Sequence, residues 1–519
     1  MRKYSALFMF FFISFYSFST TTGQKEVSLN YLKSNLEFLA DDLLEGREAT
    51  TRGEKLASLF IAKELQKYGI KPFGDNGTYF QNFDMQVKGL KDGSTIKLND
   101  ENGKPQLEFG KHFIISKRGV PSVEFANIEA NIVFAGYGAI AEDISYNDYK
   151  NIDANGKYVL IYDDLPTDEE SPFDPVTHRR LGYWSTKRTI AQEQGAIGVF
   201  IIASQATESN WDYYIDWALS PTFGLPKEPA ENKTPPKLIP SIGINKTGLQ
   251  TLMANEEVEY SELIEAYGNS ILPTSFELKK KVSVAFELYS DTRPARNVVG
   301  ILEGSDDKLK SEYVSIGAHY DHEGKRGDKI WNGADDNGSG TVAILELARK
   351  LSLDNNNNRS ILFLFHTAEE KGLIGAKYYT NNIDYIDDIV VNINIDMVGR
   401  GSTDSIHCIG SDKLSTDLYN IVEEANNDND YFTLDYRFNA PDDPNRFYWR
   451  SDHVHFANKN IPIVFFYDYM KVDYHKPTDT VDKINFEKIY KITELVKDIS
   501  LEISNRDERL KVDKVALSN

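Results

Sequence analysis

Residues 359–372 read RSILFLFHTAEEKG, an apolar run that leads into two adjacent glutamates. The apolar residues are continuous rather than alternating, which is typical of a strand covered on both faces in a parallel sheet. Three other runs share this character: EYVSIGA (312–318), DIVVNINI (388–395) and IPIVFFY (461–467). Helical patterns lie between them, most clearly GTVAILELARKLS (340–352). This alternation predicts an α/β fold with a mainly parallel sheet sandwiched by helices.

Ionisable side chains follow each of these predicted strands. His319 and Asp321 follow the run 312–318, and Glu369 and Glu370 follow the run 359–365. Asp396 follows the run 388–395, and His475 follows the run 461–467. Asp335 and Asp336 precede the helix 340–352. Because ligands bind beyond the carboxyl ends of the strands in open α/β sheets, we expect these groups to meet at one edge. Several carboxylates in one crevice repel each other unless cations hold them together. Imidazole with carboxylate suits zinc better than calcium, and the number of groups favours a two-metal site bridged by one carboxylate.

Five motifs in order carry a family resemblance: GAHYDH (317–322), NGADDNGSG (332–340), TAEEKGLIGAKYY (367–379), NIDMVG (394–399) and DYHKPTDT (473–480). Together they resemble the co-catalytic di-zinc aminopeptidases of peptidase clan MH. The resemblance covers the N-terminal helices and residues from about 291 to 505. The β-rich block 131–250 looks like the protease-associated (PA) domain that is often inserted in that family.

The resemblance implies a role for each matching position. Five positions match the zinc ligands: His319 and Asp396 on one ion, Glu370 and His475 on the other, and Asp335 as the bridge. Glu369 matches the general base, and Asp321 matches the carboxylate that fixes the tautomer of His319. Tyr474 resembles a donor to the developing oxyanion, and Arg450 is a candidate substrate contact. The implied reaction is hydrolysis of the N-terminal bond of peptides by a zinc-bridged water.

Two alternative functions stay open. A glutaminyl cyclase of the same clan would keep the fold and use one zinc. A binding protein on this scaffold would lack catalysis and would be expected to have lost metal ligands, whereas the full set is present here. His322, Asp336 and His453 are expected to have supporting or structural roles, since five positions already complete two zinc sites.

The domain boundaries can also be predicted. We expect a signal peptide (1–23), the N-terminal part of the peptidase domain (24–120), an inserted PA-like domain (121–290), the catalytic domain (291–508) and a tail (509–519). The signal peptide follows from Arg2 and Lys3 before an apolar stretch that is short for a membrane span, although a membrane anchor is the alternative. A periplasmic or secreted bacterial protein without stable membrane insertion is expected.

Charge and cysteine content limit the partners. With 58 basic and 79 acidic residues the net charge is −21, which argues against nucleic acid and anionic membranes as partners. Cys408 is the only cysteine, so an intramolecular disulfide or a thiolate metal cluster is excluded. A metal site must therefore use His, Asp and Glu. Oligomeric state and side-chain specificity are left open by the sequence.

Overall fold

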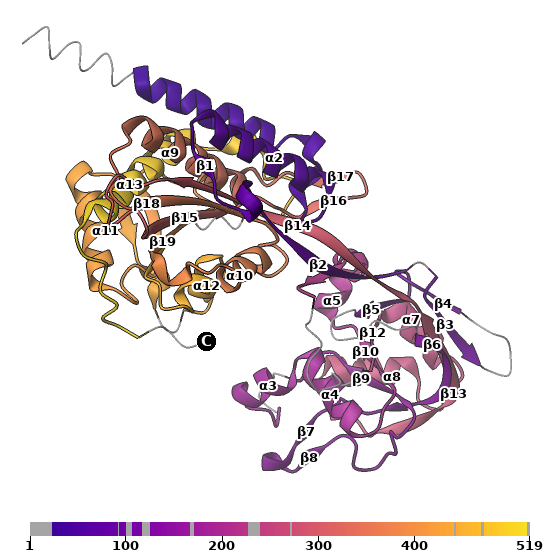
Figure 1. The fold of residues 1–519 in the computed structure, drawn as a ribbon. Helices are drawn as coiled ribbons and strands as arrows, with labels where there is room; N and C mark the ends of the chain where they lie inside the picture. The colour runs from indigo at the N-terminus through magenta and orange to yellow at the C-terminus, as the bar shows by residue number, and fades with distance from the viewer. Residues whose placement is uncertain are drawn as a thin grey trace, which may run out of the picture. The chain divides into compact units, whose positions relative to one another are not determined.

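The computed structural model describes residues 23–91, 93–99, 106–116, 125–166, 171–226, 239–269, 272–440, 443–468 and 472–515. The chain forms two compact units, one made of Met1–Met85 with Arg293–Asn519 and the other of Gln86–Thr292. It passes from one unit to the other within two long strands, β2 (Phe80–Leu90) and β14 (Leu288–Leu302) (Figure 1).

The first unit is built on a sheet whose central strands are parallel. From β14 onward, its order is β14, β18 (Ser360–His366), β15 (Tyr313–His319), β19 (Ile389–Asp396), β22 (Ile463–Tyr467), β20 (Ser405–Ile409) and β21 (Thr433–Asp435). Strands β18, β15, β19 and β22 run parallel, while β14 and β20 are antiparallel to their neighbours β18 and β22. The four predicted strands therefore form the parallel centre of this sheet.

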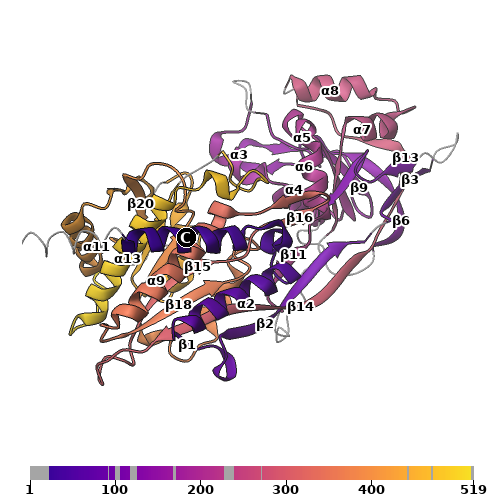
Figure 2. The same cartoon turned by 90° about the horizontal axis from the view of Figure 1, so that it is seen from above.

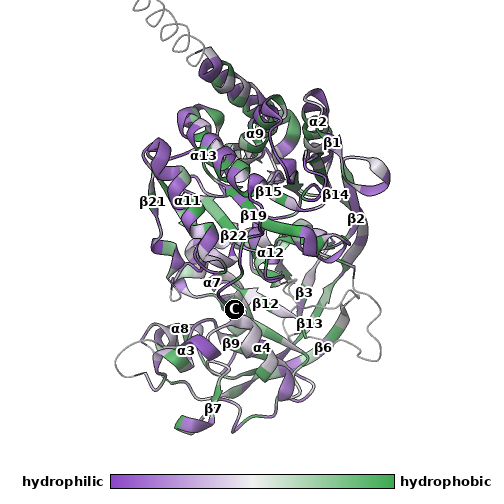
Figure 3. Ribbon diagram, turned by 60° about the vertical axis from the view of Figure 1, so that its left-hand side comes forward, coloured by the Kyte–Doolittle hydropathy of each residue, from purple (hydrophilic) through white to green (hydrophobic). Residues whose placement is uncertain are grey.

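Helices cover both faces of this sheet (Figures 1 and 2). One face carries helical residues 23–39 with α2 (Arg52–Lys67), α9 (Gly340–Asp354), α11 (Thr416–Asn429) and α13 (Phe486–Asn505), and the other carries α10 (Ile374–Asn381) and α12 (His453–Ala457). Successive residues of β18 enter opposite cores: Phe363 and Phe365 pack under α9 and α13, and Leu362 and Leu364 on the other side. This two-sided burial explains the continuous apolar runs and the hydrophobic strands in Figure 3, and the predicted α/β sandwich is confirmed.

The second unit has its own eight-stranded sheet and core. Its order is β4 (Gln106–Glu108), β3 (Thr95–Asn99), β13 (Phe276–Phe286), β6 (Phe125–Phe134), β9 (Tyr158–Tyr162), β10 (Gly198–Ile202), β12 (Ser241–Ile244) and β5 (Phe113–Ser116). The strands from β6 to β12 are parallel, and α4 (Trp184–Glu193) and α7 (Lys246–Met253) belong to the same core. Because β3 pairs with β13 and β5 with β12, this unit begins at Gln86, earlier than the predicted boundary at residue 121.

The predicted signal peptide falls almost wholly on residues 1–22, which lie outside the described part of the chain. Within the described ranges, no helix has the length and apolar character needed to span a membrane. The predicted tail is described as far as residue 515, and Arg509 Nε lies 2.7 Å from Glu312 Oε1.

Candidate active site

The strand ends of the first unit bring the predicted groups together. His319 is the last residue of β15, and Asp396 is the last residue of the neighbouring strand β19. Glu369 and Glu370 follow β18, which pairs with β15 on its other side. The carboxyl ends of parallel strands share one edge, so these side chains converge there as the sequence predicted.

The first half of the site is centred on His319. Its Nε2 atom lies 3.3 Å from Asp396 Oδ1 and 3.3 Å from Asp336 Oδ1, and the imidazole is only 1% exposed. Ser451 Oγ donates to the second oxygen of Asp396 over 2.8 Å, which fixes the direction of that carboxylate. Asn394 Nδ2 donates in turn to Ser451 Oγ over 2.9 Å.

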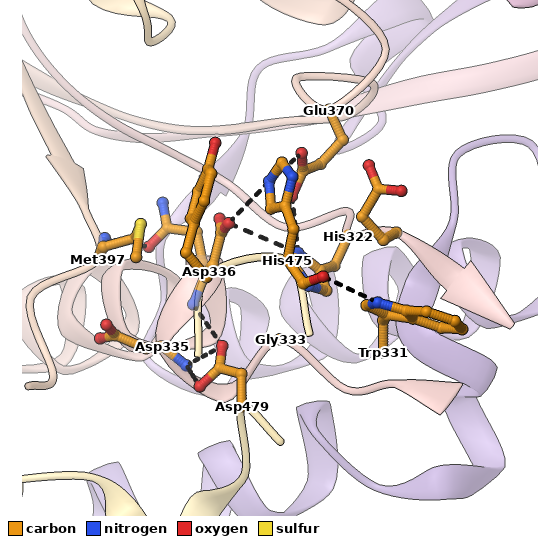
Figure 4. A network of polar contacts seen from close by, with 12 residues as sticks. His322, Trp331, Gly333, Asp335, Asp336, Glu370, Met397, His475 and Asp479 are labelled. Carbon is orange, nitrogen blue, oxygen red and sulfur yellow. Dashed lines mark hydrogen bonds and ion pairs between the residues drawn. The ribbon is translucent and has the colours of Figure 1, made fainter. Parts of the chain in front are cut away.

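The second half of the site is centred on His475 (Figure 4). Its Nε2 atom lies 2.9 Å from Glu370 Oε2 and 3.3 Å from Asp336 Oδ2. The Trp331 indole donates to the backbone carbonyl of His475 over 3.0 Å. Trp331 ends β17 (Lys329–Trp331), which forms a hairpin with β16 (Gly324–Arg326). Asp336 Oδ1 faces His319 and Asp336 Oδ2 faces His475, so this carboxylate lies between the two histidines.

Asp336, and not the predicted Asp335, lies between the two histidines. Asp335 Oδ1 accepts from the Gly399 amide over 2.7 Å, and its carboxylate points away from His475 (Figure 4). The Asp479 carboxylate accepts from the backbone amides of both Asp335 and Asp336, at 3.0 and 3.1 Å, and so holds the turn. Adjacent side chains on such a turn point in different directions, which the motif ADD alone cannot distinguish. The prediction for Asp335 is corrected accordingly.

Glu369 lies beside the first half of the site, and Asp321 supports it. The Glu369 Oε2 atom is 3.9 Å from His319 Nε2, and its side chain is 11% exposed. The Asp321 carboxylate accepts from the Glu369 backbone amide over 3.1 Å. His319 Nδ1 is 3.1 Å from the backbone carbonyl of Asp321 and 3.7 Å from its carboxylate. Asp321 thus contacts His319 through its main chain more closely than through its side chain.

Tyr474 and Arg450 form a pair at the second half. The Tyr474 ring stacks on His475 with centroids 3.8 Å apart, and Arg450 Nη2 donates to the Tyr474 hydroxyl over 3.3 Å. Burial and the carboxylates of Asp336, Glu370 and Glu369 raise the pKa of Tyr474, although Arg450 acts in the opposite direction. The hydroxyl therefore keeps its proton and remains a possible donor.

The electrostatics of the site favour positive charge. Burial opposes protonation of His319 and His475, but Asp396 and Glu369 raise the pKa of His319 well above its usual value, and Glu370 and Asp336 raise that of His475 to about 11. Burial and the neighbouring carboxylates Glu370 and Asp396 raise the pKa of Glu369, despite the opposing effect of His319. Metal ions and protons compete for such imidazoles, so the same field that retains protons would bind cations.

Sequence reasoning missed a buried arginine that connects two loops of the site. Arg47 is 1% exposed; its Nε donates to Tyr320 O over 2.8 Å, and its Nη atoms donate to Asn332 O over 2.7 Å and Gly333 O over 3.0 Å. One loop follows His319, and the other leads to Asp336. The stretch DLLEGRE around Arg47 (42–48) has no spaced ligands that would mark it. Ser451 and Asp479 were also missed, although Asp479 lies within the quoted motif DYHKPTDT and Ser451 directly follows Arg450.

Part of the chain is similar to known peptidases. Residues 297–500 match Peptidase family M28. Leucine aminopeptidase 2 of Arthroderma otae is 27% identical over 237 residues, and a probable leucine aminopeptidase of the same organism is 28% identical over 219 residues. Each alignment covers 40% of this chain, and they cover 45% and 57% of those relatives, so the chain spans about half of their length.

Two solved structures resemble the chain over nearly its full length. An aminopeptidase from Aneurinibacillus sp. strain AM-1 has a TM-score of 0.56 at 20% identity. The superposition covers 95% of this chain and 96% of the aminopeptidase chain. A zinc aminopeptidase from Bacillus subtilis has a TM-score of 0.54 at 20% identity, covering 94% and 98%. At this identity the likeness concerns the fold. The match of residues 297–500 to Peptidase family M28, together with the five motifs, confirms the resemblance to clan MH.

Proposed function

We propose that the chain is an exported metallo-aminopeptidase that uses two zinc ions to hydrolyse the N-terminal bond of peptides. The observation that carries this proposal is the spacing of nitrogen and oxygen around Asp336. Three separations, His319 to Asp336, His319 to Asp396 and His475 to Asp336, are each 3.3 Å. Zinc bonds of about 2.0–2.1 Å in tetrahedral geometry place neighbouring ligand atoms about 3.3 Å apart.

The donor set fits zinc in two adjacent positions. His319, Asp396 and Asp336 would hold one ion, and Glu370, His475 and Asp336 the other. Imidazole and carboxylate are the ligands of catalytic zinc, and three protein ligands per ion leave a position for substrate or water. Zinc, when bound, supplies Lewis acidity toward the peptide carbonyl and the attacking water.

The chain's own residues supply the proton transfers. Glu369 lies beside His319 and is not one of the proposed zinc ligands. It can therefore accept a proton from the attacking water and pass it to the departing amine. Its raised pKa, caused first by burial, makes the proton easier to accept and to hold. Tyr474, protonated and stacked on His475, is positioned to donate to a developing oxyanion, and Arg450 orients its hydroxyl.

The substrate and setting are inferred from charge and sequence. The carboxylates of the site offer partners for the ammonium group of a peptide N-terminus, as expected of an exopeptidase. We infer that Gln86–Thr292 is the PA-like inserted domain, because its parallel strands β6, β9, β10 and β12 form a separate α/β core. Export to the periplasm or exterior rests on the leader pattern of residues 1–23.

A chelator-controlled substrate scan tests this proposal. Purified protein is assayed with aminoacyl and dipeptidyl chromogenic amides, before and after metal removal and after zinc is restored. We expect aminoacyl amidase activity that the chelator abolishes and zinc recovers. Cyclisation of N-terminal glutamine peptides with one zinc per chain would favour the glutaminyl cyclase alternative. Zinc binding without turnover of any substrate would favour a binding protein.

A further inference from the structure

The proposed zinc ligand His475 lies in a backbone conformation that its surroundings must maintain. His475 has φ 52°, in the left-handed region that residues with a Cβ atom rarely adopt. Such a conformation costs free energy and persists only where neighbouring contacts fix the chain. The Trp331 indole fixes the carbonyl of His475. The loop of residues 472–480 around His475 supplies further contacts at each of its ends.

Asp473, two residues before His475, holds the first end of this loop. The Asp473 side chain is 10% exposed, and both of its oxygens accept hydrogen bonds. Oδ2 accepts from Arg400 Nη2 over 2.7 Å, whereas Oδ1 accepts from Thr478 Oγ1 over 2.6 Å and from Lys483 Nζ over 3.0 Å. Because Thr478 follows His475 in the chain, Asp473 closes the loop around this ligand and also ties it to Arg400.

Arg400 also reaches the second end of the loop. Its Nη1 atom lies 3.9 Å from Asp479 Oδ1, an ion-pair distance, and the Arg400 side chain is 11% exposed. Asp479 in turn accepts from the backbone amide of Asp336 over 3.1 Å (Figure 4). Arg400 therefore connects the loop that carries His475 with the turn that carries Asp336, and both of these residues are proposed ligands of the second zinc.

We propose that Arg400 is a positioning residue of the second zinc site. It holds Asp473 and Asp479, and through them it sets the position of His475 relative to Asp336 without being a ligand itself. A guanidinium presents its donors in a rigid fork, so it can contact two carboxylates at once, as the single ammonium of lysine cannot. This inference rests on the proposed two-zinc function. Groups that hold metal ligands in place change metal affinity by about 10- to 100-fold when removed.

The direction of the change in zinc affinity separates positioning from a simple effect of charge. Arg400 is a cation near a site for cations, so by Coulomb's law the loss of its charge alone would strengthen zinc binding. Loss of positioning would weaken zinc binding instead. The zinc affinity of Arg400→Gln is measured by competition with a chromophoric chelator, which requires no turnover. Arg349→Gln is the matched control, because the Arg349 side chain is 14% exposed and pairs with Glu346 in α9, where it lies over the ring of Tyr31.

We expect Arg400→Gln to bind the second zinc about 10- to 100-fold more weakly, with a smaller change at the first zinc and Arg349→Gln within a few-fold of wild type. When Arg400→Gln is combined with Asp473→Asn, the loss should be smaller than the sum of the two single losses, because the two residues act through one contact.

Unchanged or tighter binding of the second zinc in Arg400→Gln would overturn the positioning role, as would equal losses at both zincs. Additive losses in the double variant would also overturn it. If Arg400→Gln fails to fold, Arg400→Lys decides by the same measurement, since it keeps the charge and loses the fork. Weaker binding of the second zinc then supports the proposal and unchanged affinity overturns it. A wild type that binds one zinc overturns both proposals, and the wild-type titration alone reveals it.

Discussion

Replacing His366 with phenylalanine should make the folded state less sensitive to acid. His366 ends β18, is 1% exposed and lies near the rings of Tyr379 and Phe456, at centroid distances of 5.7 and 6.2 Å. Neither ring nitrogen has a hydrogen-bond partner among the described residues. A phenyl ring of similar shape would fill the same space without losing a hydrogen bond.

The expected magnitude follows from the pKa of this residue. Burial, assisted by His455 and His319, lowers the pKa of His366 from 6.5 to about 3. Below pH 6.5 the unfolded chain takes up a proton that the folded chain does not, so stability is lost as the pH falls from 6.5 toward 3. At pH 5, with about 1.36 kcal/mol per pH unit, the loss from this residue is about 2 kcal/mol. At pH 8 it is negligible.

Urea unfolding at a series of pH values measures this difference. Wild type and His366→Phe are compared in the same excess of zinc, so that loss of metal in acid affects both. The variant should become about 2 kcal/mol more stable relative to wild type between pH 8 and pH 5. Parallel loss of stability in the two proteins would refute the argument that His366 is held neutral by burial.

Three further predictions concern groups around the metals. Glu369→Gln should lower kcat by about 10²- to 10⁴-fold at unchanged zinc content, whereas Glu370→Gln should lower zinc affinity; equal metal loss in both would contradict this division. Ser451→Ala removes the donor to Asp396 and should weaken the first zinc by about 10- to 100-fold in a chelator competition. Arg47→Lys keeps the positive charge but loses the planar guanidinium group that donates to three backbone carbonyls. It should lower the free energy of unfolding, measured by urea unfolding, by about 2 kcal/mol or more.

The sequence predicts the centre of the fold because burial there leaves a direct trace in residue type. The strands that lead to His319, Glu369 and Asp396 are apolar on both faces, as expected of strands between two helical layers. Their ligands then follow from the rule that strand ends meet at one edge. The boundary of the second unit was harder to predict from the sequence, because β3 and β5 pair with strands that are distant in the sequence.

The site was less predictable where backbone geometry decides which neighbour faces inward. Asp335 and Asp336 are chemically identical, and only the turn held by Asp479 directs Asp336 at both histidines. Arg47 lies more than 270 residues before the loop it holds through Tyr320 O, so no local pattern connects them.

The zinc content of wild type, Asp335→Asn and Asp336→Asn tests the central claim most directly. Each protein is dialysed after zinc loading and analysed by inductively coupled plasma mass spectrometry. An asparagine side chain has one oxygen and cannot bridge two ions, so Asp336→Asn should hold at most about one zinc per chain. Wild type and Asp335→Asn should hold about two. If Asp336→Asn kept both ions while Asp335→Asn lost them, a site bridged by Asp336 would be contradicted.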